Sequence, residues 1–150
     1  MLLLSKLADY AIIIASYSAR EPQQTYTAAE IALAVNIALP TVQKILKRLN
    51  QAGLLQSERG PHGGYRLAKR PDEISVAQII AALDGPIGLT ECSLAEDHCQ
   101  KAKGCNIRSN LSLINQALKI ALEAVTLADM IKPTPREVSI SLDSLRAHVR

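Results

Sequence analysis

Three cysteines lie close together in the chain, at Cys92, Cys99 and Cys105, and no other cysteine is present. Six residues separate the first two and five separate the last two. A loop this short can bring three thiolates to one point, where soft sulfur ligands favour an iron–sulfur cluster, Zn or Cu(I). A cysteine is often only an inert apolar residue, but these three stand in a polar, charged loop. Their grouping favours a metal or redox site over chance clustering.

Other thiol chemistries fit the pattern less well. A structural zinc site usually has closely paired cysteines and four protein ligands, and this loop has neither. Three cysteines cannot all pair within one chain, so a disulfide framework is not expected and a reducing cytoplasm fits better. A thiol redox enzyme would need a C-x-x-C pair or a nucleophile beside a base, and neither is present. We therefore expect a protein that is not an enzyme.

The composition indicates one domain of ordinary size, or a small domain with an added helix, in a chain of 150 residues. Apolar residues make up 48%, with no Phe and no Trp, so the core must be aliphatic. Lys6 and Asp9 interrupt the apolar N-terminus, which predicts an amphipathic first helix rather than a signal peptide. No stretch approaches the roughly 20 apolar residues that span a membrane. We expect a cytoplasmic protein without a membrane partner.

Positive charge gathers in the first half of the chain. Residues 1–70 carry nine Lys and Arg against four Asp and Glu, whereas residues 71–150 carry eight against ten, which accounts for the net charge of +3. Residues 44–70 alone hold seven basic residues and one acid, Glu58. A polyanionic partner for the first half would explain this asymmetry, although a solvated basic face would produce the same pattern.

The elements expected in the first half form a helix-turn-helix. Helical spacing predicts a first helix from Ser5 to Arg20. Thr27 stands three residues before Glu30, the spacing of a capping box, and predicts a short helix to Val35. After a tight connection over 36–38, a second helix is expected, with Pro40 in its first turn and its end at Gly53. Any small helical protein contains such pairs, so the pattern alone does not establish DNA binding.

The next segment favours duplex DNA. Alternating residues over 54–58 and 65–68 predict two strands that flank a turn at 59–64, which is a wing. The second helix would place Thr41, Gln43 and Lys44 in the major groove, and Arg59 would reach a minor groove. The full set of expected DNA-binding residues is Thr27, Pro40, Thr41, Gln43, Lys44, Lys47, Arg48, Arg59, Gly60 and His62.

The second half is predicted to control this DNA-binding unit. Ser75 caps a helix that ends at Asp84 and has Val76, Ile79, Ile80 and Leu83 on its buried face. After the cysteine loop, the longest helix is expected from Asn106 to Ala128. It carries two apolar seams, which are Ile107, Leu111, Ile114, Leu118, Leu122 and Val125, and Leu113, Ile120 and Leu127. Two seams imply a second partner besides the home domain, and a homodimer is the simplest one.

The fold class expected is therefore a mainly α winged helix-turn-helix domain with a small β-hairpin wing and a long dimerisation helix. Its domains are the DNA-binding domain at 1–85, the cysteine loop at 86–105, the dimerisation helix at 106–132 and a partly mobile tail at 133–150. A homodimer would suit a palindromic operator in double-stranded DNA.

Three motifs resemble the Rrf-type winged-helix transcription regulators over residues 1 to 132. They are the start Met1-Leu2-Leu3-Leu4-Ser5-Lys6 with Tyr10-Ala11, the wing from Arg59 to Leu67, and the cysteine loop. Within that family the chain is most similar to the IscR-type iron–sulfur cluster regulators and those of the SUF assembly operon. The resemblance implies a homodimeric repressor of iron–sulfur assembly genes that binds a [2Fe–2S] cluster through Cys92, Cys99 and Cys105. It also implies that Gln43 discriminates bases and that Arg59 enters the minor groove.

The chain departs from this family pattern at two points. The first cysteine interval is one residue longer, and Arg108 stands where the cluster regulators have a histidine ligand. Arginine does not deprotonate and cannot ligate. The fourth ligand stays open among His98, Asp97, Glu91 and a residue of the partner's first helix, and His98 is equally compatible with a solvated loop histidine. The alternative function is a winged-helix regulator whose cysteines act as a metal-free redox or small-molecule sensor.

Overall fold

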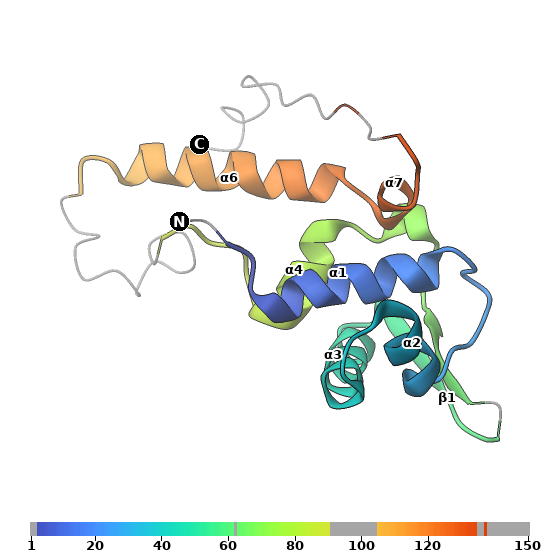
Figure 1. The fold of residues 1–150 in the computed structure, drawn as a ribbon. Helices are drawn as coiled ribbons and strands as arrows, with labels where there is room; N and C mark the ends of the chain where they lie inside the picture. Colours follow the sequence, from blue (N-terminus) through green and yellow to red (C-terminus); the bar gives the residue numbers. More distant parts are fainter. Residues whose placement is uncertain (1–2, 62, 91–104, 135–136, 138–150) are drawn as a thin grey trace.

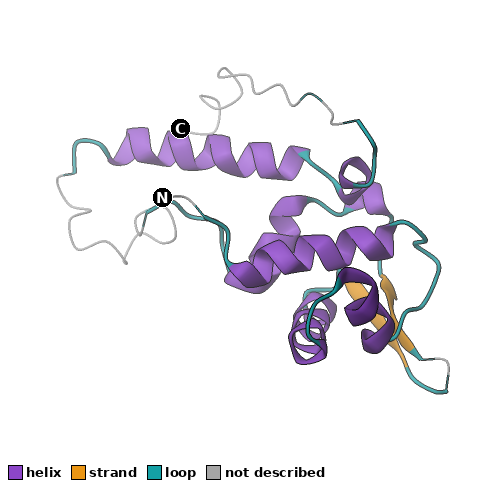
Figure 2. Ribbon diagram, in the orientation of Figure 1, coloured by secondary structure: helices purple, strands orange, loops and turns teal. Residues whose placement is uncertain are grey.

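The computed structural model describes residues 3–61, 63–90, 105–134 and 137. Several predicted site residues lie outside the described residues: the cluster ligands Cys92 and Cys99, the DNA-binding residue His62, and the candidate fourth ligands Glu91, Asp97 and His98. Most of the predicted tail lies outside them as well. The elements in order are α1 (Lys6–Ala19), α2 (Ala28–Val35), α3 (Leu39–Gln51), β1 (Leu55–Glu58), β2 (Gly64–Leu67), the 3-10 turn η1 (Pro71–Glu73), α4 (Val76–Asp84), α6 (Arg108–Ala124) and α7 (Leu127–Met130). The described chain is mainly helical with one hairpin, which confirms the predicted fold class (Figure 2).

Side-chain caps set the starts of three helices where the sequence predicted them. Ser5 Oγ accepts the Ala8 N–H at 3.0 Å before α1. Thr27 and Ser75 each form a capping box, with Glu30 and Gln78 respectively. These bonds satisfy N–H groups that a helix leaves unpaired in its first turn. After α3, Gly53 has a φ of +70°, a conformation that glycine adopts without the steric penalty of a Cβ.

An aliphatic core holds α1, α3 and α4 together. In Figure 1, α1 and α4 lie between α6 on one side and the α2–α3 pair on the other, and α1 packs against α2, α3, α4 and α7. The largest fully buried side chains are Ile14, Ile31, Val42, Ile45, Leu46, Leu49, Ile74, Ile79 and Leu127. Burying a side chain of this kind contributes about 1.5–3 kcal/mol each. The core thereby fixes α3 on the domain.

The hairpin is joined to the start of α2 as well as to itself. β1 and β2 pair antiparallel, with Leu55 opposite Leu67 and Glu58 opposite Gly64. Tyr26 forms an isolated bridge with Tyr65 through two backbone hydrogen bonds of 2.9 and 2.8 Å. The position of the hairpin is therefore tied to the first turn of the helix-turn-helix.

The prediction of one long helix from about Asn106 to Ala128 is wrong at its C-terminal end. α6 begins at Arg108 and ends at Ala124, and α7 follows as a separate short helix. Val125 is extended because its carbonyl accepts the Val76 N–H, while the Leu127 N–H is donated to the Ile74 carbonyl, both at 2.9 Å. Thr126 and Asp129 then form a capping box that starts α7. The chain crosses the start of α4 at the point where the helix was expected to continue.

This break changes the role of the residues after it. Leu127, which was predicted on the second seam of the long helix, has no exposed surface and belongs to the core. None of the side chains of α6 is buried within the described structure, and Ile114 is 54% exposed. The segment predicted as one dimerisation helix over 106–132 therefore contains an amphipathic helix without a fully buried side chain and a short helix that belongs to the core around α1 and α4.

Among the described residues, no single helix is long and apolar enough to cross a membrane; α2 and α3 pass that test only as a pair, with a bend of 118° between them.

Candidate nucleic-acid interface and cysteine segment

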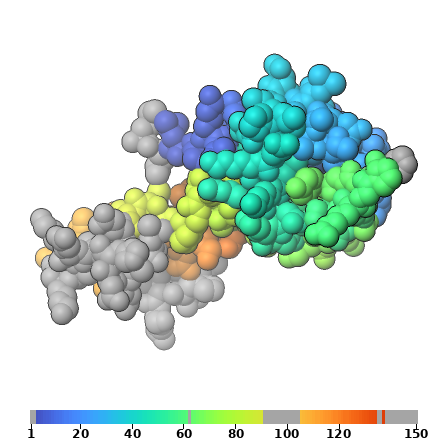
Figure 3. Space-filling model, turned by 90° about the horizontal axis from the view of Figure 1, so that it is seen from below, coloured from blue at the N-terminus to red at the C-terminus, as the bar shows by residue number. Residues whose placement is uncertain are grey.

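The predicted DNA-binding elements lie on one face of the molecule. Figure 3 looks onto this face and shows α2, α3 and the hairpin side by side. In Figure 1, α6 lies on the other side of α1 and α4. The bend of 118° between α2 and α3 is in the range of helix-turn-helix units. Asn36 makes the turn possible because it adopts a left-handed conformation with a φ of 54° at the end of α2.

α3 exposes a polar row and buries its apolar face. Gln43, Lys44 and Lys47 are exposed, and so is Pro40 in the first turn, while Thr41 is half-buried beside them. The opposite face, formed by Val42, Ile45, Leu46 and Leu49, is fully buried. The row therefore has the donors and positive charges that contact base edges and phosphates in a major groove.

Two of the predicted DNA-binding side chains have partners within the protein. Arg48 is half-buried, and its Nη1 donates a hydrogen bond of 2.6 Å to the Leu83 carbonyl at the end of α4. The Thr27 hydroxyl donates to Glu30 Oε2 at 2.8 Å. The bonds that the Thr27 backbone and hydroxyl donate hold the pKa of Glu30 below its usual value. Thr27 acts as a helix cap, and the carboxylate beside it would repel a phosphate at this position.

The wing has an exposed tip, and side-chain bonds brace the strand that leads to it. Arg59 and Gly60 are exposed, and the Gly63 N–H is donated to the Gly60 carbonyl at 2.9 Å. Directly before the tip, at the end of β1, Glu58 accepts from Arg66 Nε at 2.7 Å and from the Thr25 hydroxyl at 3.0 Å. These bonds hold the strand from which Arg59 projects.

The predicted cysteine loop at 86–105, called the cysteine segment from here on, has contacts with the fold at both of its ends. Cys105 is half-buried just before α6 and is the one predicted ligand within the described residues. At the other end, the Ser5 hydroxyl donates to Asp84 Oδ1 at 2.6 Å, and the Leu89 N–H is donated to Asn115 Oδ1 at 3.0 Å. The sequence did not predict these contacts, because Ser5 has the position of a helix cap and Asn115 belongs to no recognisable motif. Within the described residues, no three metal-binding side chains gather at one point.

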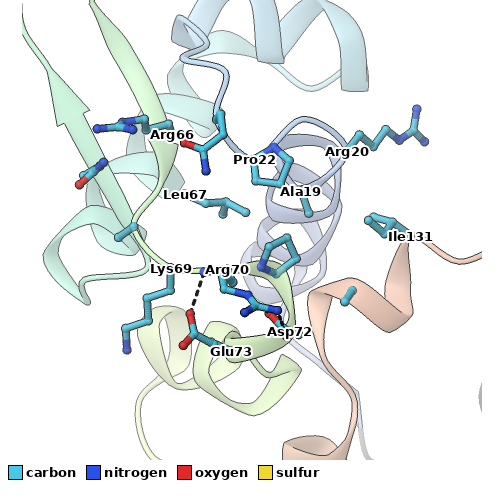
Figure 4. Close-up of a pocket in the computed structure, with 15 residues that line it drawn as sticks. Ala19, Arg20, Pro22, Arg66, Leu67, Lys69, Arg70, Asp72, Glu73 and Ile131 are labelled. Atoms are coloured by element: carbon cyan, nitrogen blue, oxygen red, sulfur yellow. Dashed lines mark hydrogen bonds and ion pairs between the residues drawn. The ribbon is translucent and has the colours of Figure 1, made fainter.

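One cavity lies away from α3. It has a volume of about 760 Å³ and lies between the end of α1, β2, η1 and α7 (Figure 4). Both carboxylates of its lining are bonded to Arg70. The Arg70 guanidinium donates to Asp72 through Nε at 3.0 Å and Nη2 at 2.7 Å, and the Arg70 backbone N–H donates to Glu73 at 3.0 Å. None of the predicted site residues lines it.

Comparison with known proteins covers nearly all the described chain. Residues 4–133 match the Rrf2 family model, described as an iron-dependent transcriptional regulator. The chain is 31% identical over 103 residues to the HTH-type transcriptional regulator IscR of Aliivibrio salmonicida, a match that spans 69% of this chain and 61% of that protein. It is 30% identical to the HTH-type transcriptional regulator NsrR of Geobacillus kaustophilus, over 86% of this chain and 89% of that one. Among solved structures, the global cysteine regulator CymR (YrzC) of B. subtilis superposes with a TM-score of 0.69 at 31% identity, covering 89% of this chain and 99% of that one.

Proposed function

Because the chain belongs to the Rrf2 family of transcriptional regulators, we propose that it is a repressor of iron–sulfur cluster assembly genes that senses a [2Fe–2S] cluster. The family makes it a DNA-binding regulator and not an enzyme. The DNA-binding part of the proposal rests on one observation, the exposed row of Gln43, Lys44 and Lys47 beside a wing held by the Glu58–Arg66 ion pair. Gln43 would read a base edge, the two lysines would contact phosphates, and Arg59 would enter the minor groove.

The exposed apolar surface of α6 supports a homodimer that would bind a palindromic operator. This helix is amphipathic and leaves Ile114 54% exposed, and Ile107, directly before the helix, is 57% exposed. A second copy packed on this face by two-fold symmetry would cover them and present two α3 helices to successive half-sites. Such a regulator acts where the chromosome is, in the cytoplasm.

The donor set fits a thiolate-bound cluster. Cys92, Cys99 and Cys105 lie within one segment, and Cys105 is placed at the start of α6 with part of its surface accessible. A [2Fe–2S] cluster needs four protein ligands and supplies a redox-active group that is present only when iron and sulfide are. Arg108 occupies the first turn of α6 and cannot ligate. The fourth ligand would come from His98, Asp97, Glu91 or the partner's first helix.

Sensing would work through the ends of the cysteine segment. Three cysteines ligating one group would draw the segment together between α4 and α6, and thereby bias the spacing of the two α3 helices in the dimer. The match to IscR spans 61% of that protein. IscR therefore supports this proposal as a relative and does not establish the function of this chain.

Anaerobic reconstitution with iron and sulfide tests the cluster directly. We expect a brown protein with visible charge-transfer absorption, and loss of that absorption in Cys92→Ser, Cys99→Ser and Cys105→Ser. Ser109→Ala, a change at an exposed serine near the segment, is the control and should keep the colour. Operator binding is then compared between loaded and unloaded protein. Equal affinity of the two forms would disprove cluster sensing even if the cluster forms.

A metal-free sensor is the second candidate. It is favoured by the likeness to CymR, described as a global cysteine regulator, which covers 99% of that chain. In this case the reconstituted protein stays colourless, while operator affinity changes with a thiol oxidant or a small molecule.

A further inference from the structure

Arg48 does not join the exposed row of α3. Its neighbours Lys44 and Lys47 are exposed, whereas Arg48 is half-buried and turns back against the domain. Its Nη1 donates a hydrogen bond of 2.6 Å to the Leu83 carbonyl. That carbonyl lies in the last turn of α4, where unpaired carbonyl groups carry partial negative charge and attract a guanidinium. The bond joins α3 to the end of α4.

The end of α4 is also where the cysteine segment begins. Asp84 follows Leu83, and Gly85 then leaves the helix with a φ of +86°. The Ser5 hydroxyl holds Asp84 at 2.6 Å. One turn of α4 is therefore tied to α3 through a backbone carbonyl and to α1 through a side chain. Any change in the direction of the chain at Gly85 acts on both ties.

Residues 86–89 have room to move. A cavity of about 480 Å³ lined by Ile80, Leu118 and Leu122 adjoins them, and a second of about 340 Å³ lies between them, Ala81 and Lys119. The Leu89 N–H bond to Asn115 links these residues to α6. Close-packed interiors transmit strain, but a segment flanked by open space can shift without disturbing the core. Displacement here would act first on the end of α4, where the Leu83 side chain lies in the buried core and its carbonyl accepts the bond from Arg48.

We propose that Arg48 is a positioning residue, which transmits the state of the cysteine segment to α3 through the Leu83 carbonyl and does not contact the DNA backbone. The inference rests on the proposed function, because it needs a segment whose state changes. Ile45 and Leu49 pack α3 into the same buried core as Leu83, and a close-packed interior transmits strain, so a shift of the Leu83 carbonyl tilts α3 as one element. Lys44, one turn earlier, would move with it in the groove.

The test compares Arg48→Met with Lys47→Met, the adjacent exposed lysine. Operator affinity is measured against salt concentration and in the cluster-loaded and unloaded forms. Lys47→Met should lower the salt slope by about 0.9, as loss of one phosphate contact does, and should keep the affinity ratio between the two forms. Arg48→Met should leave the salt slope unchanged and bring that ratio close to one, from a wild-type ratio of about 5 to 150 that is typical of coupled sites.

Arg48→Lys should restore most of the ratio between the operator affinities of the loaded and unloaded forms, because an ammonium can also donate to a carbonyl. If Arg48→Met does not fold, Arg48→Gln serves in its place, since it is polar but too short to reach Leu83. A salt slope reduced by Arg48→Met, or a ratio equal to that of wild type, would overturn the inference alone. A wild-type ratio of one would overturn the proposed sensing and the inference with it.

Discussion

Gly64 lies directly against the backbone of Tyr26. A Cβ built on Gly64 would collide with the Tyr26 carbonyl oxygen and would lie 2.6 Å from its carbonyl carbon. The close approach exists because Tyr26 and Tyr65, the next residue, exchange two backbone hydrogen bonds. The wing can dock on the start of α2 only if its strand carries no side chain at this point.

Gly64→Ala should therefore weaken the wing and DNA binding together. The methyl group would force Tyr26 and Tyr65 apart, and overpacking of this kind costs about 1–3 kcal/mol. Urea unfolding measures the loss of stability, and operator binding measures the loss of affinity. Ser57→Ala, an exposed change on the opposite strand, is the matched control. An alanine variant with wild-type stability would show that the bridge does not constrain the wing.

Lys44 and Lys119 should differ in their effect on DNA binding although both are exposed lysines. Lys44 lies on the exposed row of α3, whereas Lys119 lies on α6. Lys44→Ala should lower operator affinity and reduce the salt slope by about 0.9, and Lys119→Ala should change neither. Fluorescence anisotropy of labelled operator over a salt series gives both quantities. Equal slopes for the two variants would place the DNA elsewhere.

The starts of the helices could be predicted because their signals are local. Ser5, Thr27 and Ser75 each bond a residue three positions later in the sequence, and such pairs are visible without a structure. Thr126 and Asp129 carry the same signal. The apolar spacing of α6 continues through Val125 and Leu127, however, and by itself predicts one uninterrupted helix.

The contacts around the cysteine segment could not be predicted in this way. Arg48 bonds a backbone carbonyl 35 residues away, and Ser5 bonds Asp84 across 79 residues. A carbonyl has no residue type that a sequence pattern could reveal, and an exposed arginine on a basic helix suits DNA equally well. Only the packing of α3 on α4 decides which partner Arg48 meets.

Leu127→Ala should destabilise the domain strongly if α7 is part of its core. Leu127 is fully buried, and truncating such a leucine costs about 2–5 kcal/mol. Met130 is on the same short helix but is 45% exposed, so Met130→Ala should cost much less. Thermal and urea unfolding of both variants provide the comparison. Similar small losses would mean that α7 is only loosely attached.

Asp129 should make stability depend on pH in the acid range. The hydrogen bond from Lys132, followed by those from Thr126, holds the pKa of Asp129 well below its ordinary value of 3.8. A lowered folded-state pKa stabilises the fold above the ordinary value, and this contribution is lost as the pH falls below about 4. Wild type should exceed Asp129→Asn in stability above that pH, and the gap should close in acid. In a Lys132→Met background, Asp129→Asn should cost less stability above that pH, because the hydrogen bond that lowers the Asp129 pKa most is then absent. A gap that is constant from pH 6 to pH 2 would contradict the assignment.

Ile114→Glu should separate dimerisation from folding. Ile114 is 54% exposed on α6, where none of the side chains is buried, so a charge there leaves the monomer core intact. In the proposed dimer the same charge would be placed in an apolar interface without a partner, which is strongly unfavourable. Sedimentation should show a monomer, circular dichroism a folded helical protein, and binding to a full palindrome should fall to that of a half-site. Lys119→Ala, on the same helix, should stay dimeric. An Ile114→Glu variant that remains a dimer would move the interface away from this face of α6.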